Sequence, residues 1–257
     1  MSAPNAVRLS VEGRVARVAL NRPPLHILDL PTLEEYSSTL AQLDREQGVV
    51  VCVLEATGDK AFSTGVDVKD HTPDRVGAML ERFHGVIRKV RRLDCVTVAA
   101  VRGMALGGGF ELALACDMIV AEEGATFGVP EIWLGCFPPV AAAVLPRHIS
   151  PQKAYEIVLS GEPITAIEAQ QMGLVNALAP RGRMEETVDR FASLFTEKSA
   201  AALRVAKRAL RLSEEAAFGR TLEETERLYL EDLMRTEDAR EGIQAFLDKR
   251  EPKWKDR

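Results

Sequence analysis

Short apolar segments with the pattern of β-strands recur along the first half of the chain. Apolar and polar residues alternate from Val7 to Val11, and a second extended run covers residues 15–20, so these two segments predict a hairpin. Residues 49–56 and 95–101 are continuous apolar runs, which is typical of strands that are buried on both faces.

Two intervening segments have the period of amphipathic helices. Apolar residues recur at helical spacing in residues 31–47, where Pro31 fits a first turn, and again in residues 74–92. Because buried strands alternate with amphipathic helices, the chain is predicted to be an α/β protein.

The pattern changes after about residue 183, where strand signals disappear. Four successive stretches rich in Glu, Arg and Lys have the pattern of helices: residues 183–196, 199–213, 219–235 and 237–249. They contain too few apolar residues for an independent domain, so we expect a helical appendage that packs on the core or on a neighbouring subunit. The predicted organisation is a core of residues 1–195 and a C-terminal oligomerisation region of residues 196–257.

The composition is that of an ordinary globular protein, with 46% hydrophobic and 28% charged residues among 257. The formal net charge of −5 argues against general nucleic-acid binding. The N-terminal residues lack the basic and apolar regions of a signal peptide, and no run approaches the roughly 18 apolar residues of a membrane helix. A cytoplasmic location without membrane contact is therefore expected.

The cysteines show neither a disulfide framework nor a zinc site. Cys52, Cys95, Cys116 and Cys136 have no C-x-x-C spacing, and the first three lie in apolar runs. We interpret them as thiols of a reduced compartment.

A run of glycines after the strand at 95–101 carries the first chemical signal. Residues 103–109 are expected to form a loop, and residues 110–116 have the pattern of a short apolar helix. The glycines at 107–109 disfavour a helix interior, but at a helix start they let a ligand approach N–H groups that lack intrahelical partners. The alternatives are close strand–helix packing and a phosphate nest, although G-x-x-x-G-G-G matches neither common phosphate motif.

Two glutamates stand out because their neighbours are apolar. Glu111 lies within the predicted short helix, and Glu131 lies in FGVPEIWLG, residues 127–135. Such carboxylates either form structural ion pairs, which is the commoner case, or take part in proton transfer. Two of them in one pocket would have their pKa values driven apart into one acid and one base. Sequence separation leaves open whether they meet.

A third segment, KAFSTGVDVKDH at residues 60–71, follows the strand at 49–56. Ser63-Thr64-Gly65 is expected to turn so that the next residue, Val66, presents its N–H outward. Taken alone, the segment is better explained as an ordinary strand-to-helix loop.

Together the three segments resemble those of the enoyl-CoA hydratase, or crotonase, family. KAFSTGVDVKDH is similar to the family's K-x-F-x-x-G-x-D loop, RGMALGGGFELALACDMIVA to its G-x-x-x-G-G-G-x-E-L-A-x-x-C-D segment, and ATFGVPEIWLG to its F-x-x-P-E-x-x-L-G. The similarity continues to residues 241–254 and covers nearly the whole chain. It implies the α/β crotonase (ClpP/crotonase-like) spiral of ββα units, with C-terminal helices that form a homotrimer or a dimer of trimers.

The resemblance also implies roles for individual residues in an acyl-CoA hydratase. The two N–H groups that bind the thioester carbonyl fall on Val66 and Gly108, while Glu111 is expected to activate water and Glu131 to donate the proton. Coenzyme A would enter as part of the substrate, and no metal or further cofactor is implied. Other positions expected to contact substrate or coenzyme A are Leu25, Ser63, Gly65, Asp67, Gly107, Trp133, and, reaching a neighbouring subunit's coenzyme A, Phe246 and Lys249.

Two segments depart from the pattern of aliphatic hydratases. LGCFPPVAAAVLPRHI, residues 134–149, replaces a glycine-rich P-G-A-G-G-T-Q-R-L, and NRPPLHILD, residues 21–29, replaces N-R-P-x-x-x-N-A-L. Both resemble the cyclohexa-1,5-diene-1-carbonyl-CoA hydratases of anaerobic benzoyl-CoA degradation, in which water adds 1,4 across a ring diene. We expect this activity. A broad-range aliphatic enoyl-CoA hydratase or isomerase of fatty-acid oxidation is the alternative.

Two further classes of function are less well supported. Some relatives of the family bind RNA through a basic helix, and Arg88, Lys89, Arg91 and Arg92 cluster here, but a solvated helix end favourable to the helix dipole explains them better. A protease on the same fold would need a Ser–His–Asp set, and the four histidines occur in no such arrangement.

Overall fold

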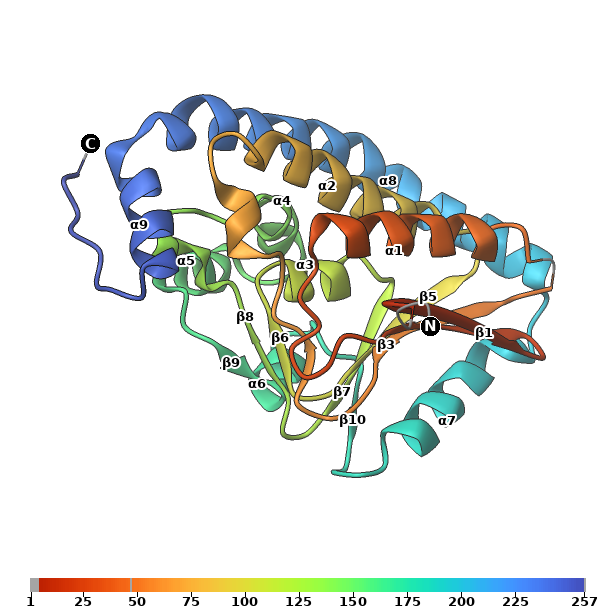
Figure 1. Ribbon diagram of the computed structural model, residues 1–257. Coiled ribbons are helices and arrows are strands. Elements are labelled where there is room, and N and C mark those ends of the chain that lie inside the picture. The colour runs from red at the N-terminus through yellow and green to blue at the C-terminus, as the bar shows by residue number, and fades with distance from the viewer. Residues whose placement is uncertain (1–4, 47, 257) are drawn as a thin grey trace.

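The strands predicted from the sequence lie together in one sheet, and shorter strands form a second. The structure, a computed structural model, describes residues 5–46 and 48–256 (Figure 1). The first sheet has the order β1 (Val7–Glu12), β2 (Val15–Leu20), β3 (Val51–Ala56), β5 (Val96–Val101), β7 (Met118–Glu122) and β10 (Ala177–Ala179). The second has the order β4 (Ala61–Ser63), β6 (Met104–Leu106), β8 (Thr126–Gly128) and β9 (Ile164–Thr165).

The chain alternates between the two sheets, which confirms the predicted spiral. β3 is followed by β4, β5 by β6, and β7 by β8, so each pair places one strand in each sheet before a helix follows. The hairpin β1–β2 is antiparallel, as predicted, while β2, β3, β5, β7 and β10 pair in parallel. The predicted loop at 103–109 contains β6, a strand too short to show a period.

Helices surround the sheets. They are α1 (Leu30–Leu43), α2 (Val76–Arg92), α3 (Gly108–Leu114), α4 (Pro139–His148), α5 (Pro151–Ser160), α6 (Ala166–Gln171), α7 (Met184–Thr196), α8 (Ala200–Arg227) and α9 (Glu237–Leu247). Shorter turns are η1 (Val68–His71), η2 (Pro130–Leu134), the π-helical η3 (Leu228–Asp232) and η4 (Leu233–Arg235). The helix predicted at 31–47 ends at Leu43, and Gln47 lies outside the described residues.

The strands β3 and β5 of the first sheet are buried on both faces, as their continuous apolar runs predicted. Val51 and Val53 of β3 belong to a smaller core under α7, together with Met184 and Val188. The alternate residue Leu54 faces the main core on the other side, which lies beneath α1 and α2 (Figure 1).

The expectation of two helices at 199–213 and 219–235 was wrong. A single helix, α8, runs from Ala200 to Arg227 and continues into η3. Gly219 lies inside it and costs about 1 kcal/mol relative to alanine. Burial of Phe218 and Leu222 and packing against α4 outweigh that cost, because helices in proteins are stabilised mainly by tertiary contacts.

Three of the four basic side chains near the end of α2 bind other helices. Arg88 pairs with Glu226 of α8 at 2.7 Å, and the Arg91 guanidinium lies 4.1 Å from the ring centroid of Phe218. Lys89 donates to α1. The cluster that suggested RNA binding therefore serves helix packing.

A partly buried charge cluster fixes α8 to the sheet. Lys207 lies 2.5 Å from Asp117 Oδ2 and also donates to the carbonyl of Cys95, while Arg211 lies 3.5 Å from Asp117 Oδ1. Asp117 in turn accepts from the N–H of Thr97 at 2.7 Å. The helix of the C-terminal region is thus tied to β5 of its own chain. The role of residues 196–257 in joining subunits stays a prediction.

Replacing Asp117 by Ala should lower the free energy of unfolding by about 2–4 kcal/mol, because Lys207 and the Thr97 N–H lose their acceptor. Urea denaturation measures the change. Glu156→Ala is the matched control, since it removes an exposed pair with Lys153 and should change stability by less than about 0.5 kcal/mol. Equal effects of the two substitutions would show that the cluster does not hold α8 in place.

Candidate active site

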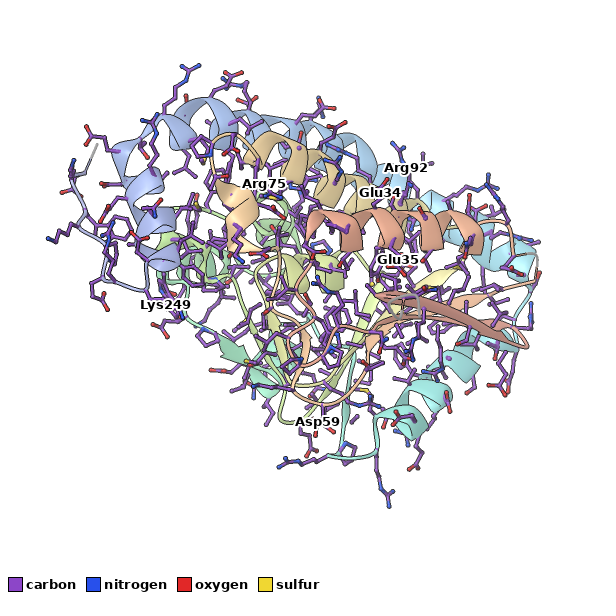
Figure 2. All side chains as sticks on the ribbon, in the orientation of Figure 1. Glu34, Glu35, Asp59, Arg75, Arg92 and Lys249 are labelled. Carbon is purple, nitrogen blue, oxygen red and sulfur yellow. The ribbon has the colours of Figure 1, made fainter. Side chains whose placement is uncertain are left out.

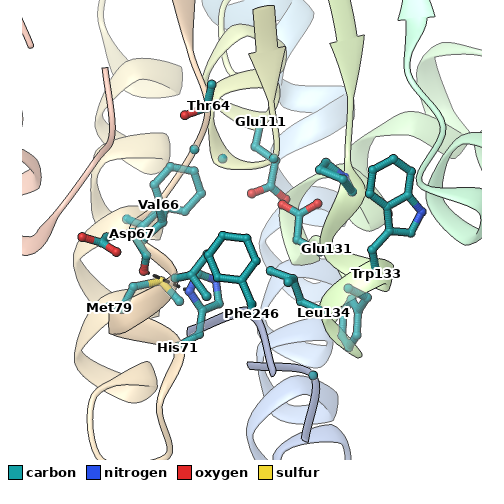
Figure 3. A pocket seen from close by; sticks show the side chains of 18 of the residues that line it. Thr64, Val66, Asp67, His71, Met79, Glu111, Glu131, Trp133, Leu134 and Phe246 are labelled. Atoms are coloured by element: carbon teal, nitrogen blue, oxygen red, sulfur yellow. Dashed lines mark hydrogen bonds between the residues drawn. The ribbon is translucent and has the colours of Figure 1, made fainter. Parts of the chain in front are cut away.

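A cavity of about 500 Å³ opens where α3, η2, the β4–η1 loop and the C-terminal helices meet (Figure 3). Its wall is mostly apolar, as in most small-molecule sites. The residues expected from the sequence that line it are Leu25, Gly65, Val66, Asp67, Gly107, Gly108, Glu111, Glu131, Trp133 and Phe246. The structure therefore brings together segments that are more than 200 residues apart in the sequence.

The three glycines at the start of α3 make room for neighbouring parts of the same chain. Gly107 has φ +52°, and a Cβ there would lie 2.7 Å from Glu131 Oε1. A Cβ at Gly109 would lie 2.2 Å from the carbonyl oxygen of Ser63. Close strand–helix packing therefore explains these glycines. It brings the backbone of α3 against the end of β4.

The same contact brings two backbone N–H groups into one cavity. Gly65 has φ +91°, and a Cβ there would lie 2.9 Å from the Gly108 nitrogen, so the two loops abut. Among the described residues, no hydrogen bond outside helices and strands uses the N–H of Val66 or Gly108. Gly108 is the first residue of α3, where N–H groups have no intrahelical acceptor.

Ser63 holds this arrangement from behind the cavity wall. Its side chain is fully buried, donates to the carbonyl of His26 at 2.8 Å and accepts from the N–H of Gly65 at 3.1 Å. It does not line the cavity. Ser63 therefore supports the Gly65 turn, and a direct contact with substrate is not part of this geometry.

The two glutamates meet in the cavity, which the sequence alone left open. Figure 3 shows the carboxylates of Glu111, from α3, and Glu131, from η2, side by side. Glu111 Oε1 accepts from the N–H of Ala141 at 2.9 Å, whereas Glu131 Oε2 is buried without a hydrogen-bond partner.

Both carboxyl groups hold their protons more tightly than usual. Burial raises the pKa of Glu111 to about 7, and the N–H groups of Ala141 and Val140 only partly offset it. Burial and the negative charge of Glu111 raise the pKa of Glu131 to about 8. No described cation contributes to either pKa, so the structural ion pair that was the commoner expectation for Glu111 is wrong.

The sequence matches the family described as enoyl-CoA hydratase/isomerase over residues 10–257. A cyclohexa-1,5-dienecarbonyl-CoA hydratase of Thauera aromatica is 34% identical over 100% of this chain and 98% of the relative. The chain belongs to the enoyl-CoA hydratase/isomerase family.

Other members have different acyl groups in their names. A 2,3-dehydroadipyl-CoA hydratase of Escherichia coli is 37% identical over 97% of this chain and 98% of the relative. Among solved structures, carnitinyl-CoA hydratase of Mycobacterium avium has a TM-score of 0.87 at 31% identity and covers 99% of this chain and 100% of that one. The crotonase fold and the hydro-lyase class predicted from the sequence are confirmed.

Phe246 and Lys249, which were expected to reach a neighbouring subunit, differ in their position relative to the cavity of this chain. Phe246 of α9 is 54% exposed and lines the cavity of its own chain. Lys249, just after α9, lies at the outer surface (Figure 2) and does not line the cavity. Its contact with a neighbour's coenzyme A stays a prediction.

Several cavity residues were missed by sequence reasoning. His84 and Phe83 of α2 line the cavity, as does Tyr229 of η3. The signal for His84 was its place on the apolar face of a predicted helix, among Met79, Leu80, Phe83 and Ile87. No local pattern indicated that Tyr229, far along in the C-terminal region, reaches the same cavity.

Two negative findings apply to residues 5–46 and 48–256. No helix there is long and apolar enough to cross a membrane, and no group of three or more His, Cys, Asp or Glu side chains is placed to hold a metal ion. All four cysteines are free thiols, with Cys52 and Cys136 buried.

The raised pKa values predict a loss of stability with increasing pH. Between about pH 4.5 and pH 8 the folded chain binds more protons at these carboxyls than the unfolded chain, so the unfolding free energy falls as the pH rises through this window. Glu131→Gln should leave stability nearly unchanged at pH 4 and raise it by about 2–4 kcal/mol at pH 9, measured by urea denaturation. The exposed control Glu162→Gln should show no such difference. An equal effect of Glu131→Gln at both pH values would contradict the pKa shift.

Proposed function

We propose that this family member is a hydratase that adds water to an α,β-unsaturated acyl-CoA thioester, with a cyclic dienoyl thioester as its preferred substrate. The observation that carries the proposal is the facing pair Glu111 and Glu131, buried without a counter-cation beside the N–H groups of Val66 and Gly108. This arrangement combines an acid, a base and an oxyanion site in one apolar cavity.

The two N–H groups bind the thioester oxygen in this proposal. Attack of water on the β-carbon moves negative charge onto that oxygen and gives an enolate. The N–H groups of Val66 and Gly108 are fixed by the contact between their loops, and the second begins α3, so they stabilise the charge without reorganisation. One such donor contributes roughly 3 kcal/mol to the transition state.

The surroundings of the two carboxyl groups support the division of roles. Glu111 accepts the N–H of Ala141, which stabilises its ionised form, so it is the carboxylate that deprotonates the attacking water. Glu131 Oε2 has no hydrogen-bond partner, and the charge of Glu111 raises the pKa of Glu131, so Glu131 is the group that keeps its proton for transfer to carbon. Both steps are acid–base chemistry on a coenzyme A thioester and use only these side chains.

Glu111→Gln and Glu131→Gln should each lower kcat by about 10³-fold or more, because each removes one partner of a coupled proton transfer. The double variant should be only slightly slower than either single one, since the two act as a unit. Turnover is measured as the loss of the ultraviolet absorbance of the enoyl thioester. Binding of a saturated acyl-CoA should survive in all three variants. Near wild-type kcat in either single variant would refute the assigned roles.

The acyl end of the cavity favours a compact, rigid group. Trp133, Leu134, Phe137 and Pro139 form one wall where aliphatic relatives were expected to have a glycine-rich turn. The Trp133 ring is half exposed but donates to the carbonyl of Ser160 at 2.9 Å, which fixes its orientation. A rigid wall binds a flat ring with less loss of entropy than a mobile chain. The relative named as a cyclohexa-1,5-dienecarbonyl-CoA hydratase adds to this support.

Cyclohexa-1,5-diene-1-carbonyl-CoA should exceed crotonyl-CoA in kcat/KM by about 10–200-fold, the range that shape alone supplies per mismatched methylene-sized contact. A panel of cyclic and linear enoyl thioesters measures the ratio. In deuterium oxide, the new label should sit on the distal diene carbon of the ring. Equal rates on both substrates would reject the cyclic specificity and leave hydration standing.

A further inference from the structure

Two polar side chains of the cavity have no part in the proposed hydration. Three described residues that line this cavity carry poorly satisfied buried polar atoms: Glu131 Oε2 and His84 Nε2 have no hydrogen-bond partner, and the Tyr229 hydroxyl has only the weakly accepting thiol of Cys136 beside it. Glu131 belongs to the catalytic pair. His84 and Tyr229 are 0% and 1% exposed, come from α2 and η3, and are otherwise unexplained.

Glu226 determines which nitrogen of His84 is left for a ligand. His84 Nδ1 lies 2.5 Å from Glu226 Oε1, which also accepts from Arg88 at 2.7 Å. Burial lowers the pKa of His84, so the ring is neutral near pH 7. Burial raises the pKa of Glu226, but the contacts with His84 and Arg88 lower it by more, so this pKa lies below its usual value. An ionised carboxylate only accepts, so Nδ1 carries the proton and Nε2 presents a lone pair.

The helical segment that carries Glu226 also carries Tyr229 and places it close to the His84–Glu226 pair. Tyr229 follows Glu226 by three residues, and side chains at that spacing are neighbours on a helix. Its ring packs against Phe137 with the centroids 5.3 Å apart, which fixes the hydroxyl. Here α8 gives way to the π-helical turn η3, a local distortion that is frequent at functional sites.

We propose that His84 and Tyr229 bind a hydroxyl group on the acyl part of the substrate, beyond the carbons that react. A hydroxyl satisfies both residues at once, because its O–H donates to His84 Nε2 while its oxygen accepts from the Tyr229 hydroxyl. Met79, Leu80 and Phe83 make the surrounding wall apolar, so a hydrocarbon ring would leave His84 Nε2 without a partner and the Tyr229 hydroxyl with only the weak acceptor Cys136. The inference rests on the proposed function and narrows its substrate class to hydroxylated compact acyl groups.

Saturated thioesters test this without any reaction. Cyclohexanecarbonyl-CoA, its 2-, 3- and 4-hydroxy derivatives and the 3- and 4-oxo derivatives are titrated into the wild-type protein by calorimetry. The 3-hydroxy or the 4-hydroxy thioester should bind about 10-fold more tightly than the parent, as expected for two added hydrogen bonds. It should also bind more tightly than the matching ketone, which has no donor for His84 Nε2.

Tyr229→Phe should remove most of that difference between hydroxylated and parent thioesters. Tyr36→Phe is the matched control, because the Tyr36 hydroxyl is also buried without a partner but does not line the cavity, and it should keep the difference. A difference that survives Tyr229→Phe would overturn the proposal. Tighter binding of the 2-hydroxy thioester alone would also overturn the proposal, because His84 and Tyr229 would then bind the hydroxyl that hydration itself creates.

These experiments distinguish failure of the hydroxyl-binding proposal from failure of the proposed hydration. If hydroxyl-dependent binding is found and no unsaturated thioester is hydrated, the proposed hydration fails alone. If unsaturated thioesters are hydrated and no hydroxyl preference is found, this inference fails alone.

Discussion

The candidate site depends on one close approach of backbone to backbone, between the start of α3 and the end of β4. Gly109 lies so near the carbonyl of Ser63 that a Cβ would be 2.2 Å from its oxygen, and a Cβ at Gly65 would be 2.9 Å from the nitrogen of Gly108. No side chain fits between these segments. Because the segments touch, Val66 and Gly108 line the same cavity.

The start of α3 also affects the positions of both carboxylates. Glu111 lies one turn into α3, and the absent side chain at Gly107 leaves room for the carboxylate of Glu131. Two acids in a mostly apolar cavity are unfavourable when ionised if no described cation lies close enough to offset their charge, which raises their pKa values and lowers stability at high pH. The large core built from both faces of the first sheet supplies the stability that tolerates such a pair.

The C-terminal region completes the cavity rather than standing apart from it. Asp117 and Lys207 tie α8 to the sheet, and Glu226 ties its far end to His84 and Arg88 of α2. Tyr229 and Phe246 lie on the cavity wall beside residues of the first 195, so the wall is formed by two parts of the chain that differ in composition and period. The division at residue 195 describes the sequence pattern, while the cavity belongs to both parts.

The sequence by itself determined the features that depend on local pattern. The buried strands at 49–56 and 95–101, the helix at 74–92 and the glycine-rich start of α3 are all visible because period, continuous apolarity and glycine runs are properties of neighbouring residues. The resemblance to the family then identified Glu111, Glu131, Val66 and Gly108 as a set. Only the tertiary structure decided that these four share one cavity, that β4 and β6 are strands, that α8 continues through Gly219, and that His84 and Tyr229 line the same cavity. Three-residue strands have no detectable period, and packing against α4 overrides a local helix breaker. The contact of His84 in α2 with Glu226 in α8 joins positions 142 residues apart, and no local pattern records such contacts, because they are fixed by how the helices pack.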